Sequence, residues 1–298
     1  MTDKYLITAL SGGLYTVTGG GENHRCRARG AFRHKRMTPL VGDSVELSRE
    51  RDGYVISAIC DRRTELIRPP MANVDVLFIT LAPTDPEPDL LYIDKLISIA
   101  IHGGVKPVIV ITKSDISPAL AEKYAQIYRN ARLPVFAVSA YKNEGISEIS
   151  DFVREENARI FAFAGASGIG KSTLMNALFP GLSLQTGTLA DKTSRGRHTT
   201  RSVTLYRYAS GDRECYIADT PGFSMLDLIT FDFFRRDELF ATFPEFEGLD
   251  ARCRWRGCTH TKEDGCAVSA AAKSGQIAQS RYDSYLAMYD DLSKKKDW

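Results

Sequence analysis

The chain has 298 residues, of which 43% are hydrophobic and 26% are charged, and its formal net charge is only +2. This composition is typical of a globular protein, and the length predicts about two domains. No apolar run approaches the roughly 18 residues that span a bilayer, which excludes a transmembrane-helix protein. Because the N-terminus also lacks a basic-then-apolar leader, we expect a cytoplasmic protein that does not enter a membrane.

Residues 1–68 are predicted to form a small β-barrel. Four short apolar segments are separated by glycine-containing turns, namely Tyr5–Leu10, Leu14–Thr18, Ser44–Leu47 and Tyr54–Ala58. Short strands at close spacing favour a barrel, and the five-stranded oligonucleotide-binding (OB) type fits this length. The run Arg68-Pro69-Pro70 marks its end.

A basic stretch in the barrel is a candidate RNA contact. Six arginines and lysines lie close together in the sequence, namely Arg25, Arg27, Arg29, Arg33, Lys35 and Arg36. On a barrel such a strip can neutralise phosphates and make binding strongly dependent on salt. A solvated charged loop explains the same residues equally well, so this stretch alone does not distinguish an RNA contact from an ordinary surface loop.

Residues 69–230 alternate predicted strands and helices. The expected strands are Val74–Leu81, Val105–Ile111, Val135–Val138, Ile160–Ala164, Val203–Tyr208 and Glu214–Ala218, and the expected helices are Asp89–Ile101, Pro118–Asn130 and Ile146–Asn157. This alternation predicts a doubly wound, mostly parallel sheet, which binds ligands at the carboxyl ends of its strands.

The segment Thr112-Lys113-Ser114-Asp115 ends one of these strands and is a candidate guanine-binding motif. A carboxylate at Asp115 can accept hydrogen bonds from guanine N1–H and the 2-amino group, whereas adenine would leave it unpaired. The stem of Lys113 would pack along the base, and backbone N–H groups at Ser139-Ala140 would support the guanine carbonyl. The motif is short, and a solvated loop is the alternative.

A phosphate loop follows another strand. The pattern G-x-x-x-x-G-K-S occurs between a predicted strand and a predicted helix, in the segment Gly165-Ala166-Ser167-Gly168-Ile169-Gly170-Lys171-Ser172-Thr173. In that context the glycines let successive N–H groups point at an anion beside the positive end of the helix dipole. Lys171 is expected to reach the β- and γ-phosphates, and the Ser172 hydroxyl to coordinate Mg²⁺.

A second phosphate-side motif is Asp219-Thr220-Pro221-Gly222. Asp219 at the end of a strand can hold Mg²⁺, and Gly222 leaves room for its N–H to approach the γ-phosphate. Many GTPases place a glutamine next, which orients the attacking water, but here the next residue is Phe223. Hydrolysis is therefore predicted to be slow, assisted by a partner, or served by another group, for which His198 is the nearest candidate.

A cysteine cluster lies near the C-terminus. Cys253, Cys258, His260 and Cys266 form a Cys₃His set, which is the donor set that a structural Zn²⁺ prefers. The spacing is not the commonest one for zinc fingers, so unrelated thiols around a surface histidine are the alternative. If the cluster holds zinc, the metal would display the neighbouring basic and aromatic residues toward RNA, namely Arg252, Arg254, Trp255 and Arg256.

The order of these motifs carries a resemblance. The guanine motif and Ser139-Ala140 precede the phosphate loop, and Asp219 follows it, which is similar to the circularly permuted GTPases. Among them the chain resembles the bacterial ribosome small-subunit-dependent GTPases. Further matches are Gly196-Arg197-His198-Thr199-Thr200, Phe243-Pro244-Glu245-Phe246 and the cysteine cluster. The resemblance covers essentially the whole chain.

The resemblance implies a multi-domain fold. Its parts are an OB-type β-barrel (1–68), a circularly permuted α/β P-loop GTPase domain (69–230) and a mainly helical zinc-binding domain (231–298). It points to His198 as catalytic, with Lys171, and to Thr199 or Thr200 as the second Mg²⁺ ligand, without deciding between the two. The expected cofactors are GTP or GDP, Mg²⁺ and one structural Zn²⁺.

The function expected from the resemblance is that of a monomeric GTP hydrolase. It would bind the small (30S) ribosomal subunit and its rRNA and assist late maturation, with hydrolysis promoting release. A nucleotide-gated RNA-binding switch with incidental turnover is the alternative, which Phe223 favours. A phosphoryl-transfer kinase is a third, against which Asp115 argues. Because Asp219 leads out of the permuted sheet, we hypothesise that residues 223–229 carry the nucleotide state to the C-terminal segment, while residues 185–200 become ordered with GTP and Mg²⁺.

Overall fold

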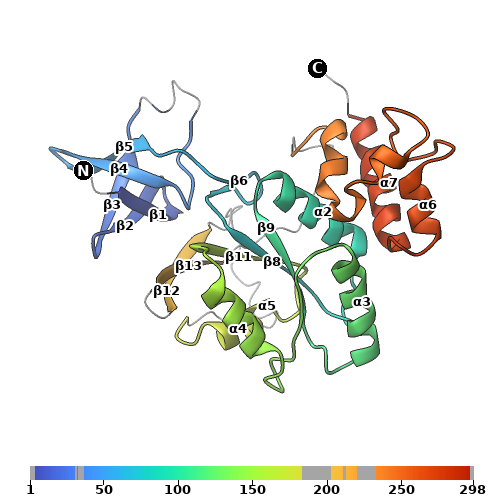
Figure 1. Cartoon of the computed structure of the whole chain (residues 1–298). Coiled ribbons are helices and arrows are strands. Elements are labelled where there is room, and N and C mark those ends of the chain that lie inside the picture. The colour runs from blue at the N-terminus through green and yellow to red at the C-terminus, as the bar shows by residue number, and fades with distance from the viewer. Residues whose placement is uncertain are drawn as a thin grey trace, which may run out of the picture.

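The computed structural model describes residues 4–30, 32, 37–182, 203–210, 213–219 and 233–295. The described chain has an N-terminal barrel, a central sheet with helices on both faces, and a C-terminal group of helices (Figure 1). Helix α2 (Leu90–His102) lies between the sheet and the C-terminal helices, as Figure 1 shows. In these parts of the chain, no helix is both long and apolar enough to cross a membrane.

The N-terminal barrel has five strands, as predicted. They are β1 (Lys4–Ser11), β2 (Leu14–Gly19), β3 (Glu22–Ala28), β4 (Ser44–Glu50) and β5 (Gly53–Ile59). Their order is β1-β2-β3-β5-β4, and pairing of β4 with β1 closes the barrel. Strand β3 was not among the four segments predicted from apolar runs, because its arginines alternate with the inward-facing Cys26.

The central sheet has the strand order β10-β9-β8-β11-β13-β12. The strands are β8 (Val76–Leu81), β9 (Lys106–Ile111), β10 (Val135–Ala137), β11 (Ile160–Ala164), β12 (Thr204–Ser210) and β13 (Arg213–Asp219). All neighbouring pairs are parallel except β12–β13, which is antiparallel. A short hairpin, β6 (Glu65–Leu66) with β7 (Met71–Ala72), precedes this sheet.

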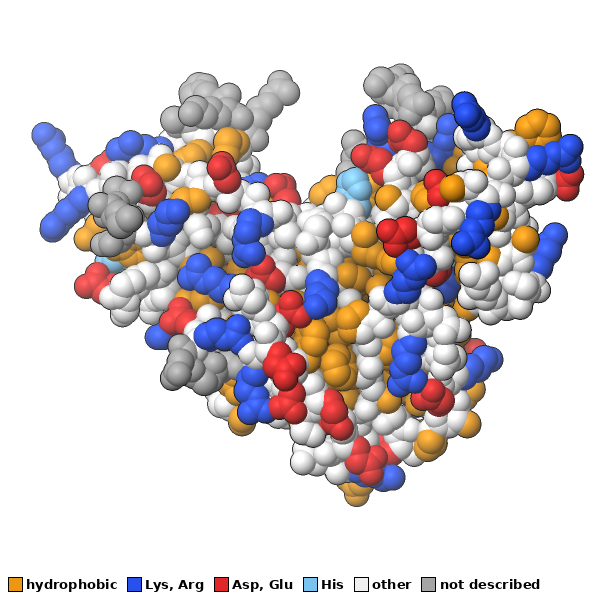
Figure 2. All heavy atoms as spheres, in the orientation of Figure 1, with side chains coloured by type: hydrophobic (Ala, Val, Ile, Leu, Met, Phe, Trp, Pro, Cys, Tyr) orange, Lys and Arg blue, Asp and Glu red, His pale blue; other side chains and the backbone are white. Residues whose placement is uncertain are grey.

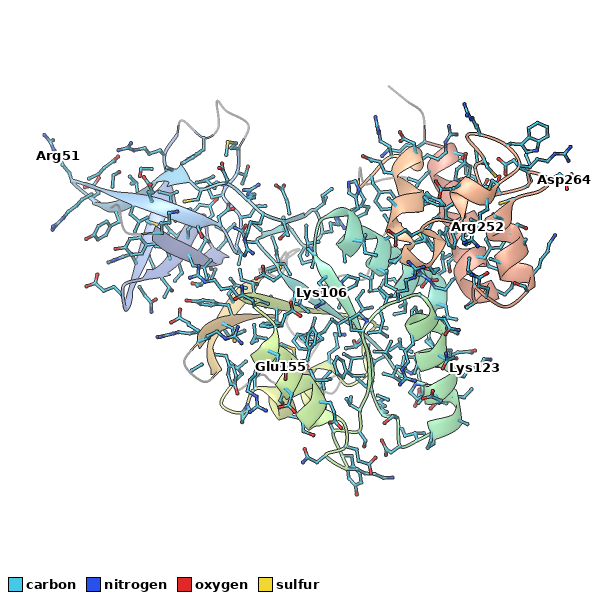
Figure 3. All side chains as sticks on the ribbon, viewed as in Figure 1. Arg51, Lys106, Lys123, Glu155, Arg252 and Asp264 are labelled. Carbon is cyan, nitrogen blue, oxygen red and sulfur yellow. The ribbon has the colours of Figure 1, made fainter. Side chains whose placement is uncertain are left out.

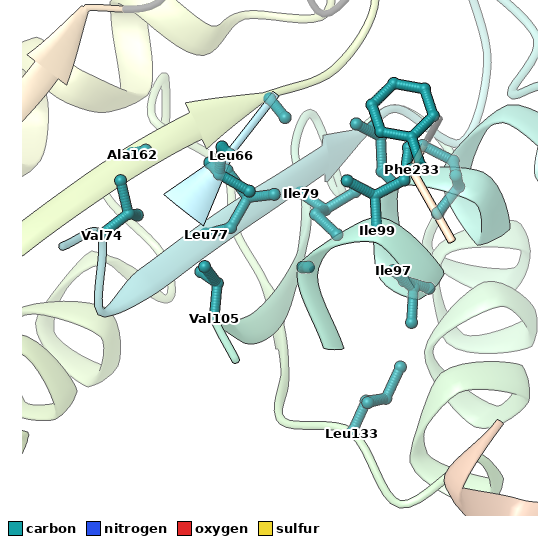
Figure 4. Close-up of a cluster of buried hydrophobic side chains, with 14 of the residues drawn as sticks. Leu66, Val74, Leu77, Ile79, Ile97, Ile99, Val105, Leu133, Ala162 and Phe233 are labelled. Carbon is teal, nitrogen blue, oxygen red and sulfur yellow. The ribbon is translucent and has the colours of Figure 1, made fainter. Parts of the chain in front are cut away.

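Helices cover both faces of this sheet because its strands are apolar on both sides. On β8, Val76 and Phe78 pack toward α4 (Ile146–Glu155) and α5 (Lys171–Leu178). The alternate residues pack with α2 and α3 (Pro118–Asn130) in a second cluster. Figure 4 draws part of this second cluster, in which Leu77 and Ile79 lie beside Ile99 of α2.

The barrel and the central sheet are hydrogen-bonded into one sheet of eleven strands. The junction is a single antiparallel pair, Ala9 of β1 with Thr204 of β12. On its other side, Thr204 pairs with Asp219 at the end of β13. Ala9 of the barrel and Asp219, the predicted Mg²⁺ ligand, are therefore paired with the same residue of β12.

The C-terminal part is mainly helical, as expected. Its described residues form three 3₁₀ turns and two α-helices, namely η1 (Arg236–Thr242), η2 (Pro244–Phe246), η3 (Asp250–Arg252), α6 (Ala267–Lys273) and α7 (Gln279–Ser293). Aromatic rings form its core, where Phe243 stacks on Phe246 and both contact the edge of Tyr285. This part packs mainly against α2.

A buried ionic cluster anchors the C-terminal part to α2. Arg281 of α7 is 1% exposed and donates to Asp94 of α2 at 2.7 Å and to Glu245 at 2.7 Å. The guanidinium also lies over the ring of Phe243, 4.4 Å from its centroid. Burial raises the pKa of Asp94, although the charge of Arg281 pulls it down. Such a cluster is stable only while every charge keeps its partner.

Candidate functional site

The motifs that the sequence assigns to one nucleotide meet at the carboxyl edge of the central sheet. Residues 112–115 follow β9, Ser139 and Ala140 follow β10, and the loop 165–170 follows β11. Because these three strands run parallel, their carboxyl ends lie on the same side. Asp219 ends the neighbouring strand β13, whose backbone is parallel to β11.

The guanine motif contacts the phosphate loop directly. The Thr112 hydroxyl lies 2.5 Å from the carbonyl oxygen of Ile169, and Thr112 itself is buried. The ammonium group of Lys113 donates to the carbonyl of Gly168 at 3.0 Å. Segments more than fifty residues apart in the sequence are therefore held together by hydrogen bonds of the protein itself.

The base motif is also tied to the end of β10. The backbone N–H of Ser114 donates to the carbonyl of Val138 at 3.0 Å. Ser139 is fully buried, and its hydroxyl accepts a hydrogen bond from the N–H of Lys142 at 3.2 Å. Asp115 is half-buried, so its carboxylate lies at the surface of this edge. The two segments predicted to contact guanine thus lie side by side.

The phosphate loop has the backbone shape that the motif requires. Gly165, Gly168 and Gly170 all have positive φ, and Gly170 immediately precedes helix α5. A Cβ atom at Gly165 would lie 2.4 Å from the carbonyl oxygen of Thr80, so only glycine fits there. The N-terminus of α5 faces the loop and supplies the positive end of a helix dipole.

The side chain of Lys171 lies over the loop. Lys171 donates to the carbonyl oxygens of Gly165 at 2.8 Å and Ala166 at 2.6 Å. Ser172 lies half-buried in the first turn of α5, whereas Ala166, Ser167 and Thr173 are exposed. This arrangement suits a polyphosphate, because the Lys171 ammonium lies against a glycine loop that leads into the N-terminus of a helix.

Several predicted residues lie outside the described part of the chain. They are His198, Thr199, Thr200, Gly222 and the segments 185–200 and 223–229. For Asp219 the backbone is described within β13 but the side chain is not. The catalytic histidine, the choice of Mg²⁺ threonine and the path to the C-terminal segment therefore stay predictions.

Two residues at this edge were not predicted. Thr80 donates its hydroxyl to the carbonyl of Ala164 at 2.7 Å, which holds the end of β8 against the start of the phosphate loop. The carbonyl of Asp85 accepts a second hydrogen bond from the ammonium of Lys113 at 3.0 Å. Thr80 could have been noticed, because it is a polar residue within an otherwise apolar strand. The hydrogen bond to Asp85 could not, because a backbone carbonyl accepts regardless of the residue type.

The Cys₃His residues converge on one point, as their donor chemistry predicted. The ligand atoms of Cys253, Cys258, His260 and Cys266 all lie within 4.8 Å of one another. His260 Nδ1 lies 3.5 Å from Cys253 Sγ and 3.6 Å from Cys266 Sγ. Zn–S bonds of about 2.3 Å and Zn–N bonds of about 2.0–2.1 Å at tetrahedral angles need an N–S separation of about 3.6 Å. The cluster therefore fits Zn²⁺.

Protonation in the cluster also suits a metal site. Burial lowers the pKa of His260, which keeps the imidazole neutral and able to donate a lone pair. Burial, with the neighbouring thiols of Cys266 and Cys253, raises the pKa of Cys258 to about 12. A divalent cation among the thiols would reverse this effect by stabilising thiolates.

A carboxylate shapes the loop that carries these ligands. Glu263 accepts hydrogen bonds from the N–H groups of Thr259 at 2.7 Å and Thr261 at 3.0 Å, on either side of His260. Burial alone would raise the pKa of Glu263, but hydrogen bonds from Thr259 and the backbone lower it to about 2. The loop is thus organised by the protein itself around the histidine.

The basic stretch of the barrel is only partly described. Arg25, Arg27 and Arg29 are exposed on or just after β3, while residues 33–36 lie outside the described chain. Arg29 is paired with Glu50 at 3.3 Å. On the face drawn in Figure 2, Lys and Arg side chains are interspersed with acidic ones over all three parts. Any RNA contact here stays a prediction.

Two family models match the chain. The model described as RsgA GTPase matches residues 59–229, and the model described as RsgA N-terminal domain matches residues 6–55. Among similar proteins, the small ribosomal subunit biogenesis GTPase RsgA of Geobacillus thermodenitrificans is 39% identical over 302 residues, covering 99% of each chain. The protein of that name from Moorella thermoacetica is 43% identical over 287 residues, covering 94% of each.

Two solved structures are similar over nearly the whole chain. YjeQ from Thermotoga maritima superposes with a TM-score of 0.80 at 30% sequence identity, covering 99% of this chain and 100% of that one. YloQ, described as a circularly permuted GTPase, superposes with a TM-score of 0.76 at 32% identity, covering 100% of this chain and 97% of that one.

Proposed function

The chain belongs to the RsgA GTPase family, and on this premise we propose that it hydrolyses GTP while bound to the small ribosomal subunit and assists maturation of that subunit. The proposal extends to rRNA as the contacted surface, to a cytoplasmic monomer and to release of the subunit on hydrolysis. One observation supports it most: Thr112 and Lys113 contact the phosphate loop at Ile169 and Gly168, so one ligand can touch both motifs.

The described residues divide the binding of a guanine nucleotide between them. The Asp115 carboxylate would accept hydrogen bonds from the base, and the Lys113 stem would cover its face. Backbone N–H groups at Ser139 and Ala140 would support the guanine carbonyl. Lys171 and the N–H groups of the loop would hold the phosphates, which concentrates positive charge where negative charge develops during hydrolysis.

Except for Ser172, the remaining roles fall on residues whose side chains are not described. Ser172, Asp219 and either Thr199 or Thr200 would hold Mg²⁺, which supplies charge neutralisation at the phosphates when bound. His198 is proposed to position the attacking water, because Phe223 in the glutamine position has no hydrogen-bonding group. Residues 223–229 would transmit the nucleotide state to the C-terminal part.

Zinc is proposed as a structural ion of the C-terminal part. The Cys₃His set would close its coordination sphere and leave no position for a substrate. The division of the chain at residues 68 and 230 is likewise proposed. Metal analysis of the purified chain is expected to give one equivalent of zinc, and Cys258→Ser is expected to reduce it. Full zinc content in that variant would contradict this ligand assignment.

Hydrolysis measured with and without small ribosomal subunits tests the proposal. We expect slow release of phosphate by the protein alone and a large stimulation by small subunits, but not by large ones. His198→Ala should bind GTP normally and lose the stimulated rate. Equal rates with and without subunits would instead favour a nucleotide-gated RNA-binding switch whose turnover is incidental.

Base recognition can be tested separately. Asp115→Asn replaces one carboxylate oxygen, an acceptor, by an N–H₂ group, a donor. The free energy of GTP binding should therefore become less favourable by about 1–3 kcal/mol. Xanthosine triphosphate, which carries a carbonyl at position 2, should gain affinity in the same variant. Ser114→Ala, which leaves the carboxylate in place, is the matched control. Unchanged GTP affinity in Asp115→Asn would remove this residue from the site.

A further inference from the structure

A hollow beside the cysteine cluster lies apart from the nucleotide site. Its volume is about 530 Å³, and its walls come from η1, the loop after η3 and helix α7. Phe240, Trp255, Tyr285 and Tyr289 line it together with arginines. The volume falls in the range of about 300–1,000 Å³ that is typical of ligand pockets.

The aromatic rings of the hollow are held in place by the fold. The Tyr285 hydroxyl donates to the carbonyl of Thr259 at 2.8 Å, and the ring of Phe240 packs 4.7 Å from that of His260. Trp255 differs from these, because it is 54% exposed. An exposed indole beside fixed aromatic walls offers an open face for stacking.

Arginines surround this aromatic surface. Between residues 251 and 257 there are three arginines and no carboxylate. Arg256 lines the hollow and forms no ion pair within the described chain, whereas Arg254 lies over Trp255, 5.1 Å from its ring centroid. Arg236 lies over Tyr289 at 5.5 Å.

Two arginines and two carboxylates line the hollow. Of the two carboxylates that line it, Asp237 is paired with Arg235 at 3.0 Å, and the other is Asp250. Arg252 and Asp264, labelled in Figure 3, lie in the same C-terminal part but do not line the hollow. Because Arg235 pairs with one of the two lining carboxylates and Arg256 forms no ion pair within the described chain, a guanidinium remains available to an anionic ligand.

We propose that this hollow binds one unpaired nucleobase of single-stranded RNA. The base stacks on Trp255, and Arg236 and Arg256 hold the flanking phosphates. A base within a duplex has both faces covered by its neighbours, so only an unstacked base can enter a hollow of this size. Aromatic stacking combined with arginine is the chemistry by which proteins hold single strands. The inference deepens the proposed function, on which it rests for the source of the RNA.

Tryptophan fluorescence provides a direct readout. The chain has two tryptophans, so Trp298→Phe leaves Trp255 as the single tryptophan, whose emission is followed. The full chain with this substitution is titrated with a six-residue oligoadenylate, with an abasic oligomer of equal length, and with a blunt RNA duplex. We expect quenching by oligoadenylate alone, and an affinity at least about fivefold higher than for the abasic oligomer.

Single substitutions then assign the contacts. With an end-labelled oligoadenylate, Trp255→Ala should weaken binding about fivefold or more, and Trp255→Phe should restore part of the loss. Arg256→Ala should weaken binding. It should also lower the slope of log affinity against log salt concentration by about 1, as expected for the loss of one phosphate contact. Arg252→Ala is the matched control, since it removes the same charge from the adjacent turn η3, outside the hollow, and should have a smaller effect. Zinc content and thermal unfolding verify that each variant is folded.

The proposal has three contrary outcomes. It fails if the abasic oligomer binds as tightly as oligoadenylate, or if Trp255→Ala leaves the affinity unchanged. It also fails if Trp255→Ala weakens binding to small subunits but not to oligoadenylate, because the occupant would then be a protein side chain. Stimulation of hydrolysis by small subunits is a separate measurement, so its absence would contradict the proposed function without touching the oligomer result.

Discussion

The barrel is joined to the central sheet by strand pairing, whereas the C-terminal part is joined to it by buried side chains. Within the sheet the first junction is one backbone pair, Ala9 with Thr204, and Ala72 and Asn73 also donate hydrogen bonds to the backbone of Val41 and Gly42. The second is the cluster of Arg281, Asp94 and Glu245, packed against α2. Backbone pairing is nearly independent of side-chain identity, while a buried charge cluster fails when any member is lost. The two ends of the chain should therefore respond very differently to substitution.

The two junctions also touch different ends of the nucleotide site. Strand β12 pairs with β13, which ends at Asp219 on the phosphate side. Helix α2 instead follows the loop whose Asp85 carbonyl accepts a hydrogen bond from Lys113 on the base side. If Asp219 holds Mg²⁺ as proposed, the barrel is placed to respond to the γ-phosphate, whereas the C-terminal part packs against a helix that follows the loop bound by Lys113.

The largest effect is expected from Arg281→Ala. It leaves the carboxylates of Asp94 and Glu245 buried without their cation, and breaking such a cluster costs about 3–5 kcal/mol. Urea unfolding measures the loss. Arg129→Ala, which breaks an exposed pair with Glu122, is the control and should cost less than about 1 kcal/mol. Similar losses in the two variants would contradict the anchoring role of Arg281.

This cluster shows what the sequence could not predict. Asp94 stands in a helix that is otherwise mostly apolar, which marks it as unusual, but its partner lies 187 residues away. Alternating strands and helices and the order of the motifs follow from local patterns, so the central sheet and the meeting of the motifs at its carboxyl edge were predictable. Strand β3 was missed because charged residues alternate along it. The pairing of Ala9 with Thr204 has no local signal at all.

A smaller loss is expected from Thr242→Val at the same junction. The Thr242 hydroxyl is buried, 2.9 Å from the hydroxyl of Ser98 on α2. Valine keeps the volume but leaves the Ser98 hydroxyl without this partner, which costs about 1–3 kcal/mol. Thr242→Ser, which keeps the hydroxyl, is the control in the same urea titration. If valine cost no more than serine, packing alone would hold this contact.

The smallest effect on stability is expected at the barrel junction. Ala9→Gly loosens β1 where it pairs with Thr204, and Ala58→Gly loosens β5 at a half-buried position away from the junction. Glycine in a strand costs about 0.5–1 kcal/mol relative to alanine, so both variants should lose a similar, small amount of stability. Their difference should instead lie in how the barrel responds to nucleotide.

Amide exchange in β1, measured with GDP and with a GTP analogue, reports that response. In the parent chain we expect slower exchange around Ala9 with the analogue, because ordering at Asp219 would be passed through Thr204 to β1. Ala9→Gly should reduce the difference between the two nucleotides, and Ala58→Gly should preserve it. If both variants kept the full difference, the single strand pair would be a passive attachment, and any signal to the barrel would have to travel another way.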